Sequence, residues 1–275
     1  MVNIAVLLFG LAGLFAKWIN LPAICITFGR VLFSSIALGI YILVRKQSFR
    51  IADRRDLFNL LCAGVILALH WWAFLESIQL SSVAVGTITF SSFPLFVTFL
   101  EPLLFHQKLK LRNVIIALII LIGVLITVPE FSLENQTFTG IFTGMISALA
   151  YAVLTLMNKR FSEKYSGTIT AFYEQATAAV VLLPFYLSTG IRPSGSDLVL
   201  LLFLGVITTA LAHTMFISSL KSIPAQLAGI FSSLETVYGI LFALILLDEI
   251  PSVREVIGAV IIVGALIYAQ KWTDQ

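Results

Sequence analysis

The sequence predicts an all-α membrane protein with ten transmembrane helices, arranged as two inverted five-helix repeats. Three observations support this prediction: the composition, a series of apolar segments, and an internal repeat. Of the 275 residues, 59% are hydrophobic and only 11% are charged, whereas a soluble domain carries about 25% charged residues. A chain so poor in charge cannot cover a surface that faces water, so its surroundings are lipid.

Ten apolar segments, separated by polar breaks, account for most of the chain. Each is close to the roughly 20 residues that an α-helix needs to cross the hydrocarbon core of a bilayer. Pro22, Pro224 and Pro251 each lie at the beginning of a segment, where a missing N–H has little effect. The expected helices cover approximately residues 3–19, 23–44, 57–79, 82–104, 111–129, 139–158, 167–187, 198–220, 224–247 and 252–270.

An internal repeat divides these segments into two sets of five. The triplet Phe90-Ser91-Ser92 recurs as Phe231-Ser232-Ser233 at an offset of 141 residues, and other residues along the segments coincide at the same offset. We therefore predict a first repeat over residues 1–135 and a second over residues 136–275. Because each repeat crosses the membrane an odd number of times, the second is inverted relative to the first, as in many secondary transporters.

The basic residues predict the orientation. They gather in the loops near residues 45–56, 105–113 and 159–166, while the loops on the opposite side hold few. By the positive-inside rule, both termini are then cytoplasmic. The net charge of +3 reflects this topology and does not indicate a nucleic-acid partner.

Glu235, near the middle of the ninth segment, is the strongest candidate for a functional residue, because a charge inside a membrane helix is costly. Phe231 and Tyr238 share its helix face. A carboxylate among aromatic rings suits a cationic or amino group, or a proton; a structural ion pair or a protonated core glutamate is the alternative. At the matching position of the first repeat, Pro94 permits a bend beside a cavity. We expect these four residues to border a central substrate site.

Two further charges lie within the second helix of each repeat, Arg30 and its counterpart Glu174. Inversion places them on opposite sides of the membrane midplane, so we do not expect a direct salt bridge between them. Arg30 could hold a substrate carboxylate, latch a gate, or pair with a carboxylate of its own half, and we favour pairing. Both residues are expected to serve in gating or ion pairing.

The third segment carries His70-Trp71-Trp72, and the repeat offset matches Trp72 with His213 of the eighth segment. We expect Trp72 and His213 to form walls of the cavity, with His70 and Tyr151 as further candidates. Trp71 is expected to face lipid, because adjacent residues diverge by about 100° around a helix. The alternative for a membrane histidine is a hydrogen-bonded packing role.

Motifs of enzymes are absent from the sequence. It contains no H-E-x-x-H, no G-x-S-x-G and no phosphate-binding glycine loop, so the chain is not expected to be an enzyme. Cysteine and histidine do not cluster with the spacing of metal ligands, and no metal or cofactor is expected. Without an ATP site, uphill transport must draw on a gradient.

The chain resembles the EamA-type family of the drug/metabolite transporter superfamily. The resemblance covers nearly the whole chain, and its motifs are diffuse. It rests on Arg30, on Ala84-Val85-Gly86 through Phe90-Ser91-Ser92-Phe93-Pro94, and on Leu246-Leu247-Asp248-Glu249 followed by Gly258 and Gly264. The resemblance implies a bacterial inner-membrane carrier that exports small metabolites, including amino acids, through a cavity lined by the first, third, fourth, sixth, eighth and ninth helices.

Three hypotheses for function follow. The first is an alternating-access exporter of small, amino-acid-like metabolites, acting as a monomer or homodimer in the lipid bilayer. The second is a proton-coupled carrier that expels cations or drugs, with Glu235 exchanging one for the other. The third is a membrane scaffold subunit without transport activity, which would have little reason to retain charges in its helices.

Overall fold

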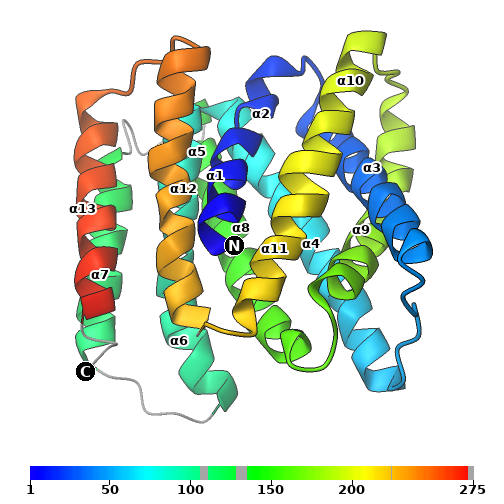
Figure 1. Ribbon diagram of the computed structural model, residues 1–275. Coiled ribbons are helices and arrows are strands. Elements are labelled where there is room, and N and C mark those ends of the chain that lie inside the picture. The colour runs from blue at the N-terminus through cyan, green and yellow to red at the C-terminus, as the bar shows by residue number, and fades with distance from the viewer. Residues whose placement is uncertain (106–110, 128–134, 224, 272–275) are drawn as a thin grey trace.

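The computed structural model describes residues 1–105, 111–127, 135–223 and 225–271, and these residues are mainly helical (Figure 1). Pro224 and residues 106–110, which belong to one of the basic loops, lie outside the described residues. The helices are α1 (Val2–Ala12), α2 (Phe15–Trp18), α3 (Ala23–Val44), α4 (Arg54–Leu80), α5 (Val83–Phe90), α6 (Phe93–Phe105), α7 (Leu111–Thr127), α8 (Gln136–Ser162), α9 (Gly167–Thr189), α10 (Gly195–Phe203), the π-helix η1 (Leu204–Leu211), α11 (Ala212–Leu220), α12 (Ala225–Leu246) and α13 (Val253–Lys271).

Several of these helices are suited to a lipid environment by length and composition. Within the part of the chain that the structure describes, five stretches are long and apolar enough to cross a membrane: α3, α4, α8, Val83–Leu104 and Gly195–Leu220. Shorter apolar stretches lie at Val2–Trp18, Val114–Thr127 and Leu234–Leu246. The outer surface carries many exposed large apolar side chains, for example Ile40 on α3 and Val180 on α9, which lipid can solvate and water cannot. The chain is therefore an all-helical membrane protein.

Polar side chains at helix ends explain where many helices begin. Asp53, Ser82, Asn135 and Ser166 each accept a hydrogen bond from a backbone N–H in the first turn of the helix that follows. These N–H groups have no partner within the helix, so a capping oxygen stabilises the helix start. Gly190 ends α9 in a left-handed conformation, with φ of 64°, which glycine adopts at little cost.

The fourth predicted segment is divided at Ser91-Ser92 into α5 and α6. Pro94, which the sequence placed in mid-helix, lies in the first turn of α6, where a proline is tolerated because its N–H would lack a helical partner. Its carbonyl accepts a hydrogen bond from Thr98 Oγ1 at 2.9 Å. The helix is therefore interrupted just before Pro94 and not at it.

The eighth predicted segment contains a π-helix. Residues Leu204–Leu211 form η1 between α10 and α11, and Thr209 Oγ1 donates to the carbonyl of Leu204, five residues earlier, at 2.7 Å. A π-helix holds more residues per turn than an α-helix, and such turns are frequent at functional sites. Every residue after η1 is consequently rotated relative to its position in a regular α-helix.

Helices α3 and α9 pack against each other along much of their length. Phe28, near the start of α3, stacks on Tyr186 near the end of α9, with 4.5 Å between ring centroids. Gly39, nearer the end of α3, approaches Phe172 near the start of α9. The two helices are therefore antiparallel.

Helix α5 is likewise antiparallel to α12. The backbone N–H of Val83, at the start of α5, donates to Glu249 Oε1 just beyond α12 at 2.7 Å. At the other end of α5, the hydroxyl of Ser91 contacts that of Thr236, in the middle of α12. The start of α5 therefore lies near the end of α12, and the end of α5 lies near the middle of α12.

The third such pair is α7 and α13, which stand together at one side of the molecule (Figure 1). Gly123 of α7 faces Ile262 of α13, and Thr127, one turn later, faces Gly258, one turn earlier. This pair is also antiparallel and packs closely at its glycines.

Two lysines cap the ends of neighbouring helices. Lys17 Nζ in α2 donates to the carbonyl of Ser81 at the end of α4 at 3.0 Å. Lys159 Nζ in α8 donates to the carbonyl of Leu220 at the end of α11 at 2.7 Å and to that of Ile223 at 3.3 Å. A cation at a helix C-terminus is favourable because the final carbonyls carry partial negative charge.

A third polar contact joins the start of α4 to the turn between α8 and α9. Asp56 accepts hydrogen bonds from Lys164 Nζ at 2.9 Å and from the hydroxyl of Tyr165 at 2.8 Å. Partial burial and the contact with Asp56 raise the pKa of Tyr165 to about 12, so its hydroxyl remains a donor at neutral pH. These contacts close one end of the bundle.

Candidate functional site

A small pocket lies where helices from both halves of the chain converge. Its walls come from α1, α3, α4 and α5 of the first half and from α8, α11 and α12 of the second. The lining residues are Phe9, Ala12, Arg30, His70, Trp71, Phe74, Phe90, Tyr151, His213 and Glu235. Aromatic rings thus surround the side chains of an arginine, a glutamate and two histidines.

Arg30 enters the pocket from α3 and is only 2% exposed. Its guanidinium carbon lies 4.1 Å above the ring centroid of Trp71, and its Nε donates to Thr209 Oγ1 in η1 at 3.1 Å. Stacking on an indole stabilises a cation that has lost its water. The remaining guanidinium N–H groups leave Arg30 able to bind a carboxylate.

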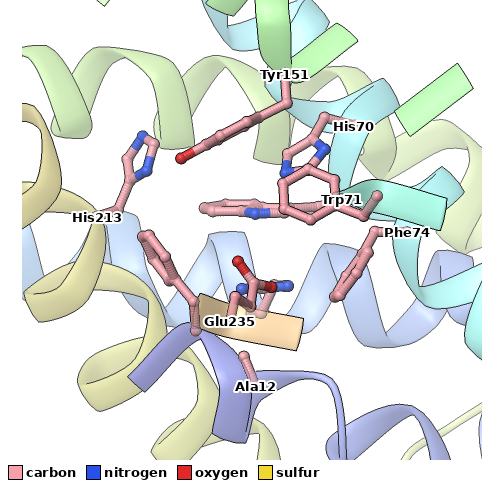
Figure 2. Close-up of a pocket in the computed structure, with 10 residues that line it drawn as sticks. Ala12, His70, Trp71, Phe74, Tyr151, His213 and Glu235 are labelled. Atoms are coloured by element: carbon pink, nitrogen blue, oxygen red, sulfur yellow. The ribbon is translucent and has the colours of Figure 1, made fainter. Parts of the chain in front are cut away.

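Glu235 enters from α12 on the other side of the pocket and is 6% exposed. Figure 2 shows its carboxylate below the Trp71 ring, with His70 and Tyr151 above that ring. Among the described residues, no cation lies within ion-pair distance of Glu235. A guanidinium and a carboxyl group therefore face one pocket, with no ion pair between them in this structure.

His213 lies in the wall of the pocket and also contacts a second carboxylate behind it. Its Nε2 is 2.7 Å from Glu174 Oε2 on α9, and both side chains are fully buried. Its ring meets Trp71 edge-on, with 5.4 Å between centroids. His213 therefore connects the pocket to Glu174, which does not line it.

His70 is fixed on the opposite wall. Its Nδ1 lies 2.8 Å from Ser147 Oγ and 3.2 Å from the Ser147 carbonyl on α8. Its ring is 4.7 Å from that of Tyr151 and 5.3 Å from that of Phe90. This histidine is a hydrogen-bonded wall residue, which combines the two interpretations that the sequence left open.

The space between these side chains is small in this structure. It measures about 20 Å³, which is room for roughly one water molecule. A metabolite of ten or more heavy atoms can enter only if the helices or the aromatic side chains move apart. The structure therefore has a contracted site.

The model of the EamA-like transporter family matches residues 1–128 and 138–269, one stretch in each half. The chain belongs to the EamA-like transporter family.

Relatives of this EamA-family chain are named as transporters. An uncharacterized transporter YxxF of Bacillus subtilis is 24% identical over 96% of this chain and 86% of its own length. An S-adenosylmethionine uptake transporter of Rickettsia felis is 25% identical over 90% of this chain and 83% of its own length. A crystal structure matches with a TM-score of 0.72 at 17% identity, covering 98% of this chain and 96% of that one, and supports the fold. The family and these names indicate a transporter rather than an enzyme.

The helices that line the pocket are those of the cavity that the resemblance implied, with α3 in addition. Arg30, which the sequence assigned to gating or ion pairing on a helix outside the implied cavity, lines the pocket from α3. Glu174 stands outside the pocket, as expected, and pairs with His213. Glu235, His213, His70 and Tyr151 all line it.

The placement of the two tryptophans was wrong. Trp71, expected to face lipid, is 5% exposed and lines the pocket, whereas Trp72 does not. The offset of 141 residues matches Trp72 with His213 only if both segments are regular α-helices. The π-helix η1, which ends just before α11, changes the direction of the side chains that follow it, and the indole that meets the His213 ring is that of Trp71.

Three other predicted residues lie near the pocket but not in its wall: Tyr238, Phe231 and Pro94. Tyr238 packs against Gly10 of α1, whose missing side chain allows the close approach of α1 and α12. Only Glu235 of the predicted aromatic face on α12 reaches the pocket.

Phe9, Ala12, Phe74 and Phe90 line the pocket and were not identified from the sequence. Phe74 had a usable signal, because it lies one helical turn after His70 on the same face. Phe90 also had a signal, because it begins the triplet that recurs at Phe231. Phe9 had none, since the chain contains 22 phenylalanines and most apolar positions of a membrane helix look alike.

Proposed function

We propose that this protein is a secondary transporter that moves small amino-acid-like metabolites out across the bacterial inner membrane by alternating access. The observation that carries the proposal is the pair of buried opposite charges, Arg30 and Glu235, facing one aromatic pocket from two different helices. Each charge is costly within a membrane. An α-amino acid supplies a carboxylate for Arg30 and an ammonium group for Glu235, and the rings accommodate its apolar part.

The packing of the helices supports the inverted repeat, with residues 1–135 and 136–275 as its two copies. Under the repeat, α3 corresponds to α9, α5 to α12, and α7 to α13. Each of these pairs is in contact and antiparallel, as a two-fold axis in the membrane plane requires. Ten membrane passes follow when α1–α2, α5–α6 and α10–α11 each count as one.

The same symmetry supports alternating access. Gly64 of α4 touches Glu174 and Thr177 of α9, and its counterpart Gly205 of η1 touches Arg30 and Phe33 of α3. The two halves thus use equivalent contacts on opposite sides of the pocket. A contracted pocket between them can open toward either side when one set of contacts separates.

The substrate class draws support from the relatives as well. S-adenosylmethionine, named for the Rickettsia relative, carries the amino and carboxylate groups of an amino acid, a sulfonium cation and an adenine ring. These groups suit Glu235, Arg30 and a wall of aromatic rings. Export, rather than uptake, rests on the family resemblance, and cytoplasmic termini rest on the basic loops.

The test is transport by the purified protein in proteoliposomes, with labelled phenylalanine and S-adenosylmethionine as probes, measured in both directions. Glu235→Gln and Arg30→Gln should each weaken apparent affinity by about tenfold or more, because each removes a charge-assisted hydrogen bond. Glu76→Gln is the matched control, since Glu76 is half-buried on α4 away from the pocket. Unchanged transport in both pocket variants would contradict the proposal.

A proton-coupled carrier of cations or drugs is the second candidate, favoured by the aromatic rings around Glu235. A cation lacking a carboxylate needs Glu235 but not Arg30. Loss of transport in Glu235→Gln with full transport in Arg30→Gln would therefore select this candidate. A scaffold subunit, the third hypothesis, would show no thermal stabilisation by any member of a metabolite library.

A further inference from the structure

The pair formed by Glu174 and His213 is not needed to bind an amino acid between Arg30 and Glu235. It lies on α9 and α11, and His213 presents its ring to the pocket while its Nε2 contacts Glu174. From this arrangement we propose that Glu174 and His213 form a proton-binding site, and that the charge of this site changes the affinity of the pocket for its substrate. The role of this site in transport rests on the proposed function. Its existence rests on the geometry of Glu174 and His213 alone.

The hydrogen bonding of Glu174 differs from that of a static ion pair. A buried carboxylate in a stable structure normally has both oxygens satisfied. Glu174 Oε2 contacts His213, but Oε1 has no hydrogen-bond partner within the described protein, and neither polar atom of the neighbouring Gln175 side chain has one. Both side chains are fully buried. A proton or a water molecule that reaches this site can supply the hydrogen bond that Glu174 Oε1 lacks.

Further buried polar groups lie on α8, α9 and α11, the helices that hold or border this pair. They lie where these helices pack together, at the end where α8 finishes and α9 begins. We call this set the polar seam. Its members each have a buried polar atom without a partner among the described residues: Thr155, Asn158, Thr170, Gln175 and Thr214. A seam of this kind can admit water or protons when the helices separate slightly.

The counterpart helices of the first half, α1–α2, α3 and α4, also bury polar side chains, but most of these have hydrogen-bond partners. Thr27 donates to the carbonyl of Ala23, Ser77 to that of Gly140, and Gln79 to those of Ala16 and Leu21. Among the described residues of these helices, only Ser34 has a buried polar side-chain atom without a partner. Unpartnered buried polar atoms are therefore more numerous on α8, α9 and α11, the side proposed for proton exchange.

Proton exchange at this site is balanced without any further reactant. An imidazolium and a carboxylate become a neutral imidazole and a carboxylate when one proton leaves. The pair then changes from a net charge of zero to minus one, beside a pocket in which Arg30 and Glu235 already compensate each other. Release of the proton would make the pocket more attractive to the cationic part of a substrate, so the two sites are coupled through charge.

Other ionisable groups around the pair are few. Arg30 faces it from α3, His70 from α4, Tyr151 from α8 and Glu235 from α12, all from the pocket wall. Helices α1 and η1, which also pack against α11, carry no ionisable side chain. Among these, His70 is the group whose own protonation could imitate that of His213, and the experiment must separate the two.

Trp71 provides the measurement, because its indole touches His213 and an imidazolium quenches indole fluorescence on contact. In a full-length protein with Trp18, Trp72 and Trp272 replaced by phenylalanine, only Trp71 emits. We expect its emission to fall in one transition as the pH decreases from about 8 to 5, the range in which histidine usually changes charge. His213→Gln should abolish the transition.

Two carboxylate variants test the pairing, with folding checked by thermal unfolding. Glu174→Gln should move the transition to lower pH or remove it, because the imidazolium loses its counter-ion. Glu235→Gln and His70→Gln should keep it. A transition that survives His213→Gln, or that disappears with His70→Gln alone, overturns the proposal. The absence of any transition in this range overturns it too, since such a site cannot exchange protons under physiological conditions.

A second readout separates this proposal from the transport function. In proteoliposomes containing a pH-sensitive dye, S-adenosylmethionine flux should be accompanied by proton flux, and Glu174→Gln should lose that proton flux. If the unmodified protein moves neither phenylalanine nor S-adenosylmethionine, the proposed function fails, while the Trp71 titration still decides whether the proton site exists. Transport with an unchanged proton flux in Glu174→Gln would refute the proton site alone.

Discussion

Replacing Gly64 by alanine tests how closely α4 and α9 pack beside the site. A Cβ at this position would lie 2.5 Å from Thr177 Cβ and 2.6 Å from the carbonyl oxygen of Glu174. Ordinary contacts begin near 3.4 Å, so the helices would have to separate by about 1 Å. Overpacking of this kind costs about 1–3 kcal/mol, and a gap of this size also weakens the dispersion contacts along the interface.

The control is Gly264→Ala on α13, where an added Cβ meets nothing within 4 Å. Alanine favours a helix over glycine by about 1 kcal/mol at both positions, so this gain cancels when the two variants are compared. The remaining difference is the steric cost. We therefore expect Gly64→Ala to have a free energy of unfolding about 1–3 kcal/mol lower than that of Gly264→Ala.

The measurement is unfolding of the purified protein by sodium dodecyl sulfate, followed by tryptophan fluorescence. Gly205→Ala should behave like Gly64→Ala, because a Cβ there would lie 2.7 Å from Phe33 Cβ and 2.9 Å from the Arg30 carbonyl oxygen. If Gly64→Ala is as stable as Gly264→Ala, then α4 and α9 are not packed as described, and the position of Glu174 behind His213 loses its support.

Further predictions concern the ends of the bundle and use the same assay. Lys17→Met and Lys159→Met should each lower the free energy of unfolding by about 0.3–1 kcal/mol, since each removes a cation from a helix C-terminus, and the exposed Lys221→Met should not. Asp56→Asn should cost about 1–3 kcal/mol, because it weakens two hydrogen bonds to a charged group. Folding raises the pKa of Tyr165 from 10 to about 12, so the stability that Tyr165 contributes is complete below pH 10 and is lost as the pH rises to 12. Tyr165→Phe should remove this alkaline decline, and an identical decline in both proteins would contradict it.

Much of the helical framework could be predicted because it depends on local patterns. Apolar runs of about 20 residues and polar breaks place each helix within a few residues, and the repeat is visible in the sequence. Glu235 could be identified as a pocket residue because a charge in the middle of an apolar segment is rare, whatever the packing. The same argument marked Arg30 and Glu174, whereas His213 was identified through the repeat offset.

The rotation of each helix about its axis could not be predicted with the same certainty. Trp71 and Trp72 are adjacent and chemically alike, and only the packing of α4 decides which one meets Arg30. The π-helix η1 has no signal in its sequence of ordinary apolar and small residues. His213 follows this π-helix and contacts Glu174 and Trp71, and a comparison of the two halves by sequence does not reveal these contacts.

The sequence by itself determined that this chain is a helical membrane protein and which few charged residues lie within its apolar segments, because these follow from composition and local order. The tertiary structure decided what each of these residues contacts. Arg30 stacks on Trp71, Glu174 contacts His213, and Glu235 lines the pocket without an ion-pair partner among the described residues. Side chains from residues 9 to 235 come together there, and contacts between such distant residues depend on how seven helices are rotated and packed against one another.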